Sequence, residues 1–307
     1  MSRSVTLLGP QRRPTLDRVL DALEVRGPVA AVTAGWQERE SDDEELMRLL
    51  SGRGLNLRLH ARWDDVLNED TDYSRAEREH RVALGELQQL YLTRLDHALR
   101  AAYAVAQRVD GHPRIQAIAV EDALATVRDV DARHLDRIAE LRAAFVAAWH
   151  PQDRDSVAKH REEIRGVLVQ AECLVIAGGH VGELLAVLDL FRIADDLPSR
   201  VVAWSAGAMA ITDRVVLFHD RAAHGPAQAE VFDVGLGIVP GVVAFPHARR
   251  RLRTDDALRM SVLARRFAPA TCLVLDDGVT VELGADRSVP AGARVVDLDG
   301  RIVEAAP

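Results

Sequence analysis

The sequence has few cysteines, and their positions argue against a disulfide or a cysteine-bound metal. The 307 residues include two cysteines, Cys173 and Cys272, and each lies within an apolar, strand-like run. Cysteines in such runs are typical of a buried, reduced core, so we expect neither a disulfide nor a metal pair. A reducing, cytoplasmic location is the corresponding expectation.

The sequence also lacks a surplus of basic residues and any long apolar run. The formal net charge of -8 leaves no excess of cations to neutralise phosphates, which argues against a general nucleic-acid partner. No apolar run approaches the roughly 18 residues that a membrane span needs. The apolar part of residues 1–9 is too short for a signal peptide. We therefore expect no nucleic-acid partner and no membrane partner.

Several familiar ligand-binding motifs are missing as well. The sequence contains neither the Gly-x-Gly-x-x-Gly nor the P-loop spacing, which disfavours nucleotide binding through a glycine-rich turn. The eleven histidines show no spacing typical of metal ligands. We expect no metal and no cofactor.

What is present is an alternation of short apolar runs and helical patterns. Runs at 4–8, 29–33, 55–59, 172–177, 200–204 and 271–275 predict strands, and segments such as 42–50 and 155–170 predict helices. This alternation predicts an α/β fold with a doubly wound, mostly parallel sheet and helices on both faces. Residues 279–282 and 294–303 predict short antiparallel strands instead, with turns at Gly284 and Gly300. We expect one α/β domain over residues 1–307.

One block, residues 62–151, interrupts the alternation and contains no convincing strand. Leucines and aromatic residues recur at helical spacing on both sides of Gly111-His112-Pro113. The pattern predicts an antiparallel pair of long amphipathic helices inserted between two strands. This helical insertion could serve as a lid, as a structural brace or as a dimerisation arm. As a dimerisation arm, it would form a homodimer.

The segment that ends in Ser205 is the most informative part of the sequence. An apolar, β-branched run stops at this serine, and small residues follow at once. Ala203 and Gly207 lie two residues before and after it. That spacing is typical of a nucleophile elbow, where a strand turns sharply into a helix and exposes one side chain. Alanine replaces the usual first glycine, and a buried strand followed by a serine N-cap would give the same pattern.

Three other segments gain interest beside this serine. Gly178-Gly179 follows one apolar run, and glycines at a strand end expose N–H groups that could bind a phosphate or an oxyanion. A glycine-rich apolar stretch leads to Pro246-His247, and another apolar run ends at Asp276-Asp277-Gly278. Each segment alone has an ordinary interpretation as a tight connection, a surface histidine or a hairpin turn.

Together, and in this order, these segments resemble those of a known family of serine peptidases. The family includes dipeptidase E (aspartyl dipeptidase) and cyanophycinase, and its fold is related to the class I glutamine amidotransferases. The resemblance covers the chain from about Glu172 to the C-terminus. It is carried by Gly178-Gly179, Trp204-Ser205-Ala206-Gly207-Ala208, the stretch from Leu236-Gly237-Ile238-Val239-Pro240 to Pro246-His247, and Leu275-Asp276-Asp277-Gly278.

The resemblance implies a Ser-His-acid catalytic triad. Ser205 would be the nucleophile and His247 the general base, because a serine hydroxyl attacks at neutral pH only when a base takes its proton. Asp277 would orient the imidazole. The family typically has a glutamate at this place, so Asp276 and Glu282 remain alternatives.

The resemblance also implies an oxyanion hole made by the N–H groups of Gly179 and Ala206. His180 departs from the family, which usually has asparagine or an acid there. Two roles stay open for His180: binding the substrate, and capping the helix that follows it.

Two further segments could contact the substrate. Gln37 and Glu38 follow a predicted strand at the edge where doubly wound sheets bind ligands. Basic residues follow His247, and Arg250 or Arg251 could hold a substrate carboxylate in a bidentate contact.

The leading hypothesis is a serine hydrolase that cleaves a small peptide or another amide through an acyl-enzyme. The resemblance implies an acidic residue near the cleaved bond. The alternative is a catalytically inactive binding or regulatory module on the same fold, with the helical insertion as its partner surface. A glutaminase of the amidotransferase kind is disfavoured, since those enzymes use cysteine where this chain has Ser205.

Overall fold

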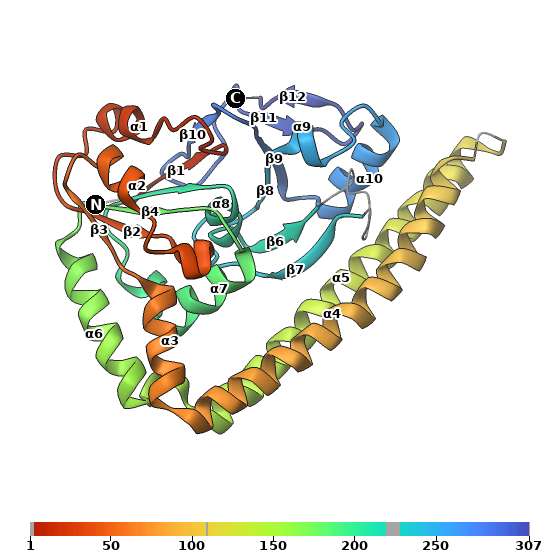
Figure 1. Cartoon of the computed structure of the whole chain (residues 1–307). Coiled ribbons are helices and arrows are strands. Elements are labelled where there is room, and N and C mark those ends of the chain that lie inside the picture. Colours follow the sequence, from red (N-terminus) through yellow and green to blue (C-terminus); the bar gives the residue numbers. More distant parts are fainter. Residues whose placement is uncertain (1–2, 109, 219–227, 307) are drawn as a thin grey trace.

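The computed structural model describes residues 3–108, 110–218 and 228–306. Its centre is a six-stranded sheet with the strand order β10-β1-β5-β4-β2-β3 (Figure 1). All its strands are parallel except β10, which pairs antiparallel with β1. The strands are β1 (Ser4–Leu8), β2 (Val29–Val32), β3 (Gly54–Asn56), β4 (Cys173–Ile176), β5 (Arg200–Trp204) and β10 (Thr280–Glu282).

Helices cover both faces of this sheet, as the alternation in the sequence predicts. Alternate residues of β4 enter two different cores: Cys173 and Val175 pack in one, Leu174 and Ile176 in the other. The first core includes α1 (Leu16–Ala22) and α2 (Glu44–Leu49). The second includes α3 (Leu59–Glu69), α6 (Asp155–Gln170) and α7 (Val181–Leu190). Strands buried on both faces explain why these runs are continuously apolar.

A second sheet holds the C-terminal strands. Its order is β12-β11-β9-β8; β8 and β9 are parallel and the other pairs antiparallel. A separate pair, β6 and β7, is antiparallel. The bounds are β6 (Arg214–Leu217), β7 (Glu230–Val234), β8 (Val242–Pro246), β9 (Thr271–Leu275), β11 (Arg294–Val296) and β12 (Ile302–Glu304). Two helices, α9 (Ala248–Arg251) and α10 (Ala257–Phe267), connect β8 to β9.

The sequence-based expectations need correction at two strands. Residues 271–275 do form a strand, but it lies in the second sheet rather than the central one. The predicted strand at 55–59 ends at Asn56, because Leu59 already begins α3. Both cysteines are free and buried, as expected.

The block between β3 and β4 is helical and dominated by a long hairpin. Helices α4 (Thr71–Ala106) and α5 (Pro113–Trp149) run antiparallel along each other and project beyond the sheets (Figure 1). Short 3-10 turns complete the described fold: η1 (Ala34–Arg39), η2 (Pro151–Asp153) and η3 (Ile193–Asp196). No helix in the described ranges is both long enough and apolar enough to span a membrane.

A buried polar cluster fastens the hairpin to α10 and β7. The guanidinium of Arg266 in α10 donates to both carboxylate oxygens of Asp131 in α5, at 2.6 and 2.7 Å. The hydroxyl of Tyr91 in α4 donates to Asp131 at 2.8 Å and accepts from Arg266 at 3.0 Å and from the N–H of Val231 at 2.9 Å. Arg266 and Asp131 are almost fully buried, so each charge depends on the other.

We expect Asp131→Ala to lower the free energy of unfolding by about 3–5 kcal/mol, because it leaves the Arg266 guanidinium buried without a counter-charge. Urea denaturation followed by circular dichroism measures this loss. Asp129→Ala is the matched control on the same helix: Asp129 pairs with Arg133 in solvent, and its loss should cost less than about 1 kcal/mol. Equal losses in the two variants would contradict a stabilising role for the buried cluster.

Candidate active site

Ser205 lies at a sharp turn between β5 and the short helix α8 (Ala206–Ala210). Its backbone has φ 51° and ψ -120°, a conformation that is strained for a residue with a side chain. The turn is packed so closely that a Cβ at Gly207 would lie 2.4 Å from the carbonyl oxygen of Ile176. A Cβ at Gly178 would lie 2.7 Å from Ser205 Cβ. The geometry is that of the elbow suggested by the small residues around the serine.

The diglycine turn after β4 lies directly beside this serine. Gly179 has φ +131°, and a Cβ there would lie 2.1 Å from the carbonyl oxygen of Gly35 in η1. The N–H of His180 donates to that same oxygen at 2.7 Å, which fixes the turn against η1. In the described part of the chain, the N–H groups of Gly179 and Ala206 have no protein acceptor. Both are therefore available as donors to a ligand.

His247 and Asp277 follow the neighbouring parallel strands β8 and β9. The register pairs Pro246 with Leu275, and the N–H of His247 donates to the Leu275 carbonyl at 3.1 Å. This pairing brings the two side chains to one sheet edge, where Nδ1 of His247 is 4.0 Å from Oδ1 of Asp277. That separation is an ion-pair contact and is longer than a hydrogen bond. The Asp277 side chain is 52% exposed, whereas that of His247 is 14% exposed.

The two alternative acids have other surroundings. Asp276 accepts a hydrogen bond from the N–H of Arg249 at 3.0 Å and lies within 3.5 Å of the guanidiniums of Arg249 and Arg294. Its carboxylate is thus held by α9 and β11. Glu282 is exposed on β10. It pairs with Thr6 of β1, whereas Leu8, at the carboxyl end of β1, pairs with Thr280. Of the three acids, Asp277 has the contact with His247.

A cavity of about 870 Å³ extends from the turn at Ser205 to His247. Ser205, His247, Ala206 and the diglycine all line it. The Ser205 hydroxyl has no hydrogen-bond partner among the described residues, and the imidazole of His247 is therefore not hydrogen-bonded to it.

His180 also lines this cavity, and it caps a helix as well. Its Nδ1 accepts the N–H of Glu183 in the first turn of α7 at 3.1 Å. With Nδ1 occupied by the cap, the other edge of the exposed ring is available at the cavity.

The structure places three of the expected contact residues, Gln37, Glu38 and Arg250, away from the cavity. The backbone of η1 is not helical at Gln37 (φ 58°), and the residues of this turn that line the cavity include Trp36 and Arg39 instead. Arg250 is exposed, whereas Arg251, one residue further round the short helix α9, lines the cavity. About 100° of helix rotation separates consecutive residues, which explains why only one of the pair faces inward.

Arg12 is a cavity residue that the sequence analysis missed. It follows β1, whose carboxyl end lies next to that of β5 in the sheet. The rule that ligands bind at the carboxyl ends of parallel strands would have pointed to this loop. Within the described chain neither Arg12 nor Arg251 forms an ion pair, and burial together with the charge of Arg12 lowers the pKa of Arg251.

The charges around His247 favour its neutral form. Burial lowers the pKa of His247 below its ordinary value of 6.5, the positive charge of Arg251 lowers it further, and Asp277 opposes both effects. The imidazole is therefore uncharged at pH 7, the state in which it can accept a proton.

Comparisons with known proteins identified no relative of this chain among family models or curated proteins. A scan against protein-family models gave no match, and a search of curated proteins gave no match either. The described residues contain no group of three or more His, Cys, Asp or Glu side chains arranged to hold a metal ion.

We expect an NMR titration of the imidazole protons to give His247 a pKa below 6.5, with His247→Asn identifying its signal. Arg251→Gln should raise this pKa because it removes a repelling cation, and Asp277→Asn should lower it because it removes an attracting anion. Arg250→Gln is the matched control and should shift the pKa less than Arg251→Gln, since its charge is the weaker influence. A wild-type pKa above 6.5 would contradict this account of the site.

Proposed function

We propose that the protein is a serine hydrolase that cleaves an amide bond in a small peptide or related molecule. The observation that carries the proposal is the strained turn at Ser205, which opens into the same cavity as His247. Strained, non-glycine backbone is costly and is found mostly where function requires it. The resemblance of the four sequence segments to the dipeptidase E and cyanophycinase family supports the same reaction.

In the proposed reaction, Ser205 Oγ attacks the carbonyl carbon of the substrate and its proton passes to Nε2 of His247. Nδ1 is the nitrogen closer to Asp277, which supports this choice of nitrogen. The C–N bond then breaks, and the same proton passes from the imidazolium to the leaving amine. Water attacks the acyl ester, gives one proton to His247 and releases the acid, and that proton returns to Ser205.

The negative charge on the reacting oxygen would be met by the N–H groups of Gly179 and Ala206. Their lack of protein acceptors supports this role. A single donor of this kind contributes about 2.7–4 kcal/mol to transition-state stabilisation. Because backbone groups are fixed by the fold, they need no reorganisation when the charge develops.

The two arginines of the cavity support an acidic substrate. Arg12 and Arg251 are cations without an ion-pair partner among the described residues, and the second is half-buried. A substrate carboxylate between them would relieve the repulsion that lowers the pKa of Arg251. Charge-assisted hydrogen bonds to a carboxylate are about twice as strong as neutral ones.

A fluorophosphonate probe tests the nucleophile. We expect it to label wild-type protein on Ser205, detected by intact mass and peptide mapping, with loss of fluoride from phosphorus. Ser205→Ala should abolish the labelling and His247→Ala should slow it strongly, because the hydroxyl then lacks its base. Ser199→Ala is the control, since this serine donates to the Glu172 carbonyl at the surface and should label as wild type does. Equal labelling of Ser205→Ala would refute the assignment.

The acidic preference is tested with aspartyl and asparaginyl p-nitroanilides. We expect Arg251→Gln to lower kcat/KM for the aspartyl compound by roughly tenfold to a hundredfold and to leave the asparaginyl compound much less affected. The assays are run at pH 8.5, where His247 is neutral in both proteins. Arg250→Gln carries the same change one residue away and should keep the wild-type preference. A preference that is unaltered in Arg251→Gln would contradict the carboxylate contact.

A further inference from the structure

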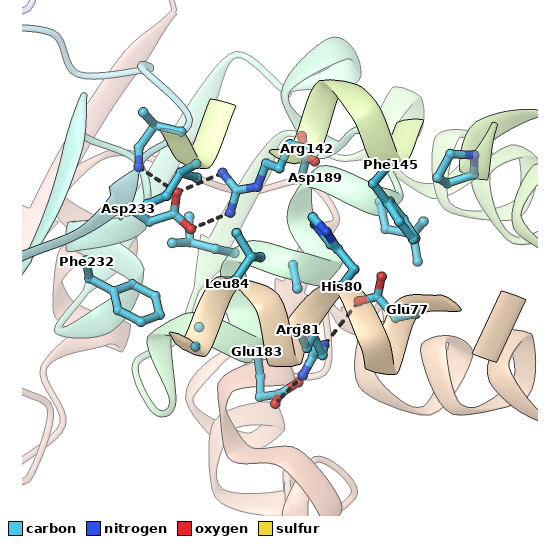
Figure 2. A pocket seen from close by; sticks show the side chains of 18 of the residues that line it. Glu77, His80, Arg81, Leu84, Arg142, Phe145, Glu183, Asp189, Phe232 and Asp233 are labelled. Atoms are coloured by element: carbon cyan, nitrogen blue, oxygen red, sulfur yellow. Dashed lines mark hydrogen bonds and ion pairs between the residues drawn. The ribbon is translucent and has the colours of Figure 1, made fainter. Parts of the chain in front are cut away.

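A second cavity, of about 400 Å³, lies where the α4–α5 hairpin meets α7 and β7 (Figure 2). It adjoins the serine cavity, because His180, Gly182 and Phe232 line both. Gly182 lies between the other two residues: a Cβ there would be 3.1 Å from the Phe232 ring and 3.2 Å from the His180 ring. The absence of a side chain at Gly182 keeps this junction from being filled.

The walls of the second cavity are rich in apolar and aromatic groups. In Figure 2, the Phe232 ring stands at one end, Leu84 lies in the middle, and Phe145 stands at the other end. His80 stacks on Phe145 with ring centroids 4.4 Å apart. Burial lowers the pKa of His80, so this ring is neutral at pH 7. A volume of this size, with such walls, is typical of a small-molecule subsite.

The cations of this cavity are held by carboxylates. Arg81 donates to both oxygens of Glu183, at 2.8 and 3.1 Å, and to Glu77 at 3.1 Å (Figure 2). Arg142 binds both oxygens of Asp233. Among the described residues that line this cavity, no guanidinium is therefore left free for a carboxylate, in contrast to the pair in the serine cavity.

We propose that the second cavity is a subsite for a large apolar group of the same substrate. The proposal rests on the proposed function: the amide lies at Ser205, the carboxylate lies near Arg12 and Arg251, and an aromatic or long aliphatic group passes Gly182 into the hairpin cavity. The substrate class is thus an amide with an acidic group and an apolar group on different sides of the reacting carbonyl. Binding energy from the apolar group would then position the carbonyl at the serine.

Gly85 provides a direct way to fill this subsite. It lines the second cavity from α4, and a Cβ added there has no neighbour within 4 Å. Gly85→Phe therefore adds bulk without a backbone clash, at a helix position where phenylalanine has a higher helix propensity than glycine. Gly166→Phe is the matched control: Gly166 lies in α6, also has open space around an added Cβ, and lines neither cavity.

The test compares two fluorophosphonates with the same reactive group, one with an ethyl chain and one with a 4-phenylbutyl chain. We expect wild type and Gly166→Phe to react at least about tenfold faster with the phenylbutyl probe, and Gly85→Phe to lose most of this ratio. A ratio in Gly85→Phe equal to that in Gly166→Phe overturns the subsite. Gly85→Leu gives a second filling variant if the phenylalanine lowers the folded fraction.

Failure of the subsite and failure of the proposed function give different results. If neither probe labels wild type, the nucleophile is wrong, and calorimetric titration of Ser205→Ala with 4-phenylbutanol then tests the cavity alone. We expect Ser205→Ala to bind 4-phenylbutanol. Adding Gly85→Phe to this variant should weaken the affinity at least about tenfold, and adding Gly166→Phe should leave the affinity unchanged. Equal affinity in both double variants, or no binding to Ser205→Ala, overturns the subsite.

Discussion

The close approach of two strand ends is the constraint on which the rest of the site depends. Where β4 and β5 finish, the backbone of α8 lies so near the carbonyls of Ile176 and Ala177 that residue 207 has room for no side chain. The same crowding requires glycine at residue 178, opposite Ser205. Ser205 has a positive φ at this turn, and it lines the cavity. The position of the Ser205 side chain at the cavity is in this sense a consequence of packing.

The second sheet has to be held in register with this turn, because His247 and Asp277 come from it. Backbone hydrogen bonds supply the connection: the N–H of Leu236 donates to the Ala210 carbonyl at 2.8 Å, and the N–H of Val239 donates to the Ile211 carbonyl at 2.9 Å. The chain that leaves the elbow helix therefore guides the segment that becomes β8. Main-chain links of this kind position His247 more rigidly than side-chain contacts from a loop would.

Local signals in the sequence predicted the parts of the fold that depend on neighbouring residues. The apolar runs at 4–8, 200–204 and 271–275 have the bounds of β1, β5 and β9, and the leucine spacing predicted the two hairpin helices. The division into two sheets was not predictable, since it depends on which distant strands pair. The orientation of single side chains also escaped prediction: Arg250 and Arg251 have the same chemistry in the sequence, and only the rotation of α9 distinguishes them.

The hairpin acts on the site through the two elements that flank the junction between the cavities. Arg81 holds the first turn of α7 and Arg142 holds β7, while Gly182 and Phe232, the residues at the junction, belong to those same elements. Further along the hairpin, the buried Arg266–Asp131 pair fixes its angle against α10. Because breaking a buried charge pair is strongly unfavourable, the hairpin cannot swing away without a large cost. The width of the junction is consequently set by the fold, so the walls of the second cavity are in place before any molecule enters it.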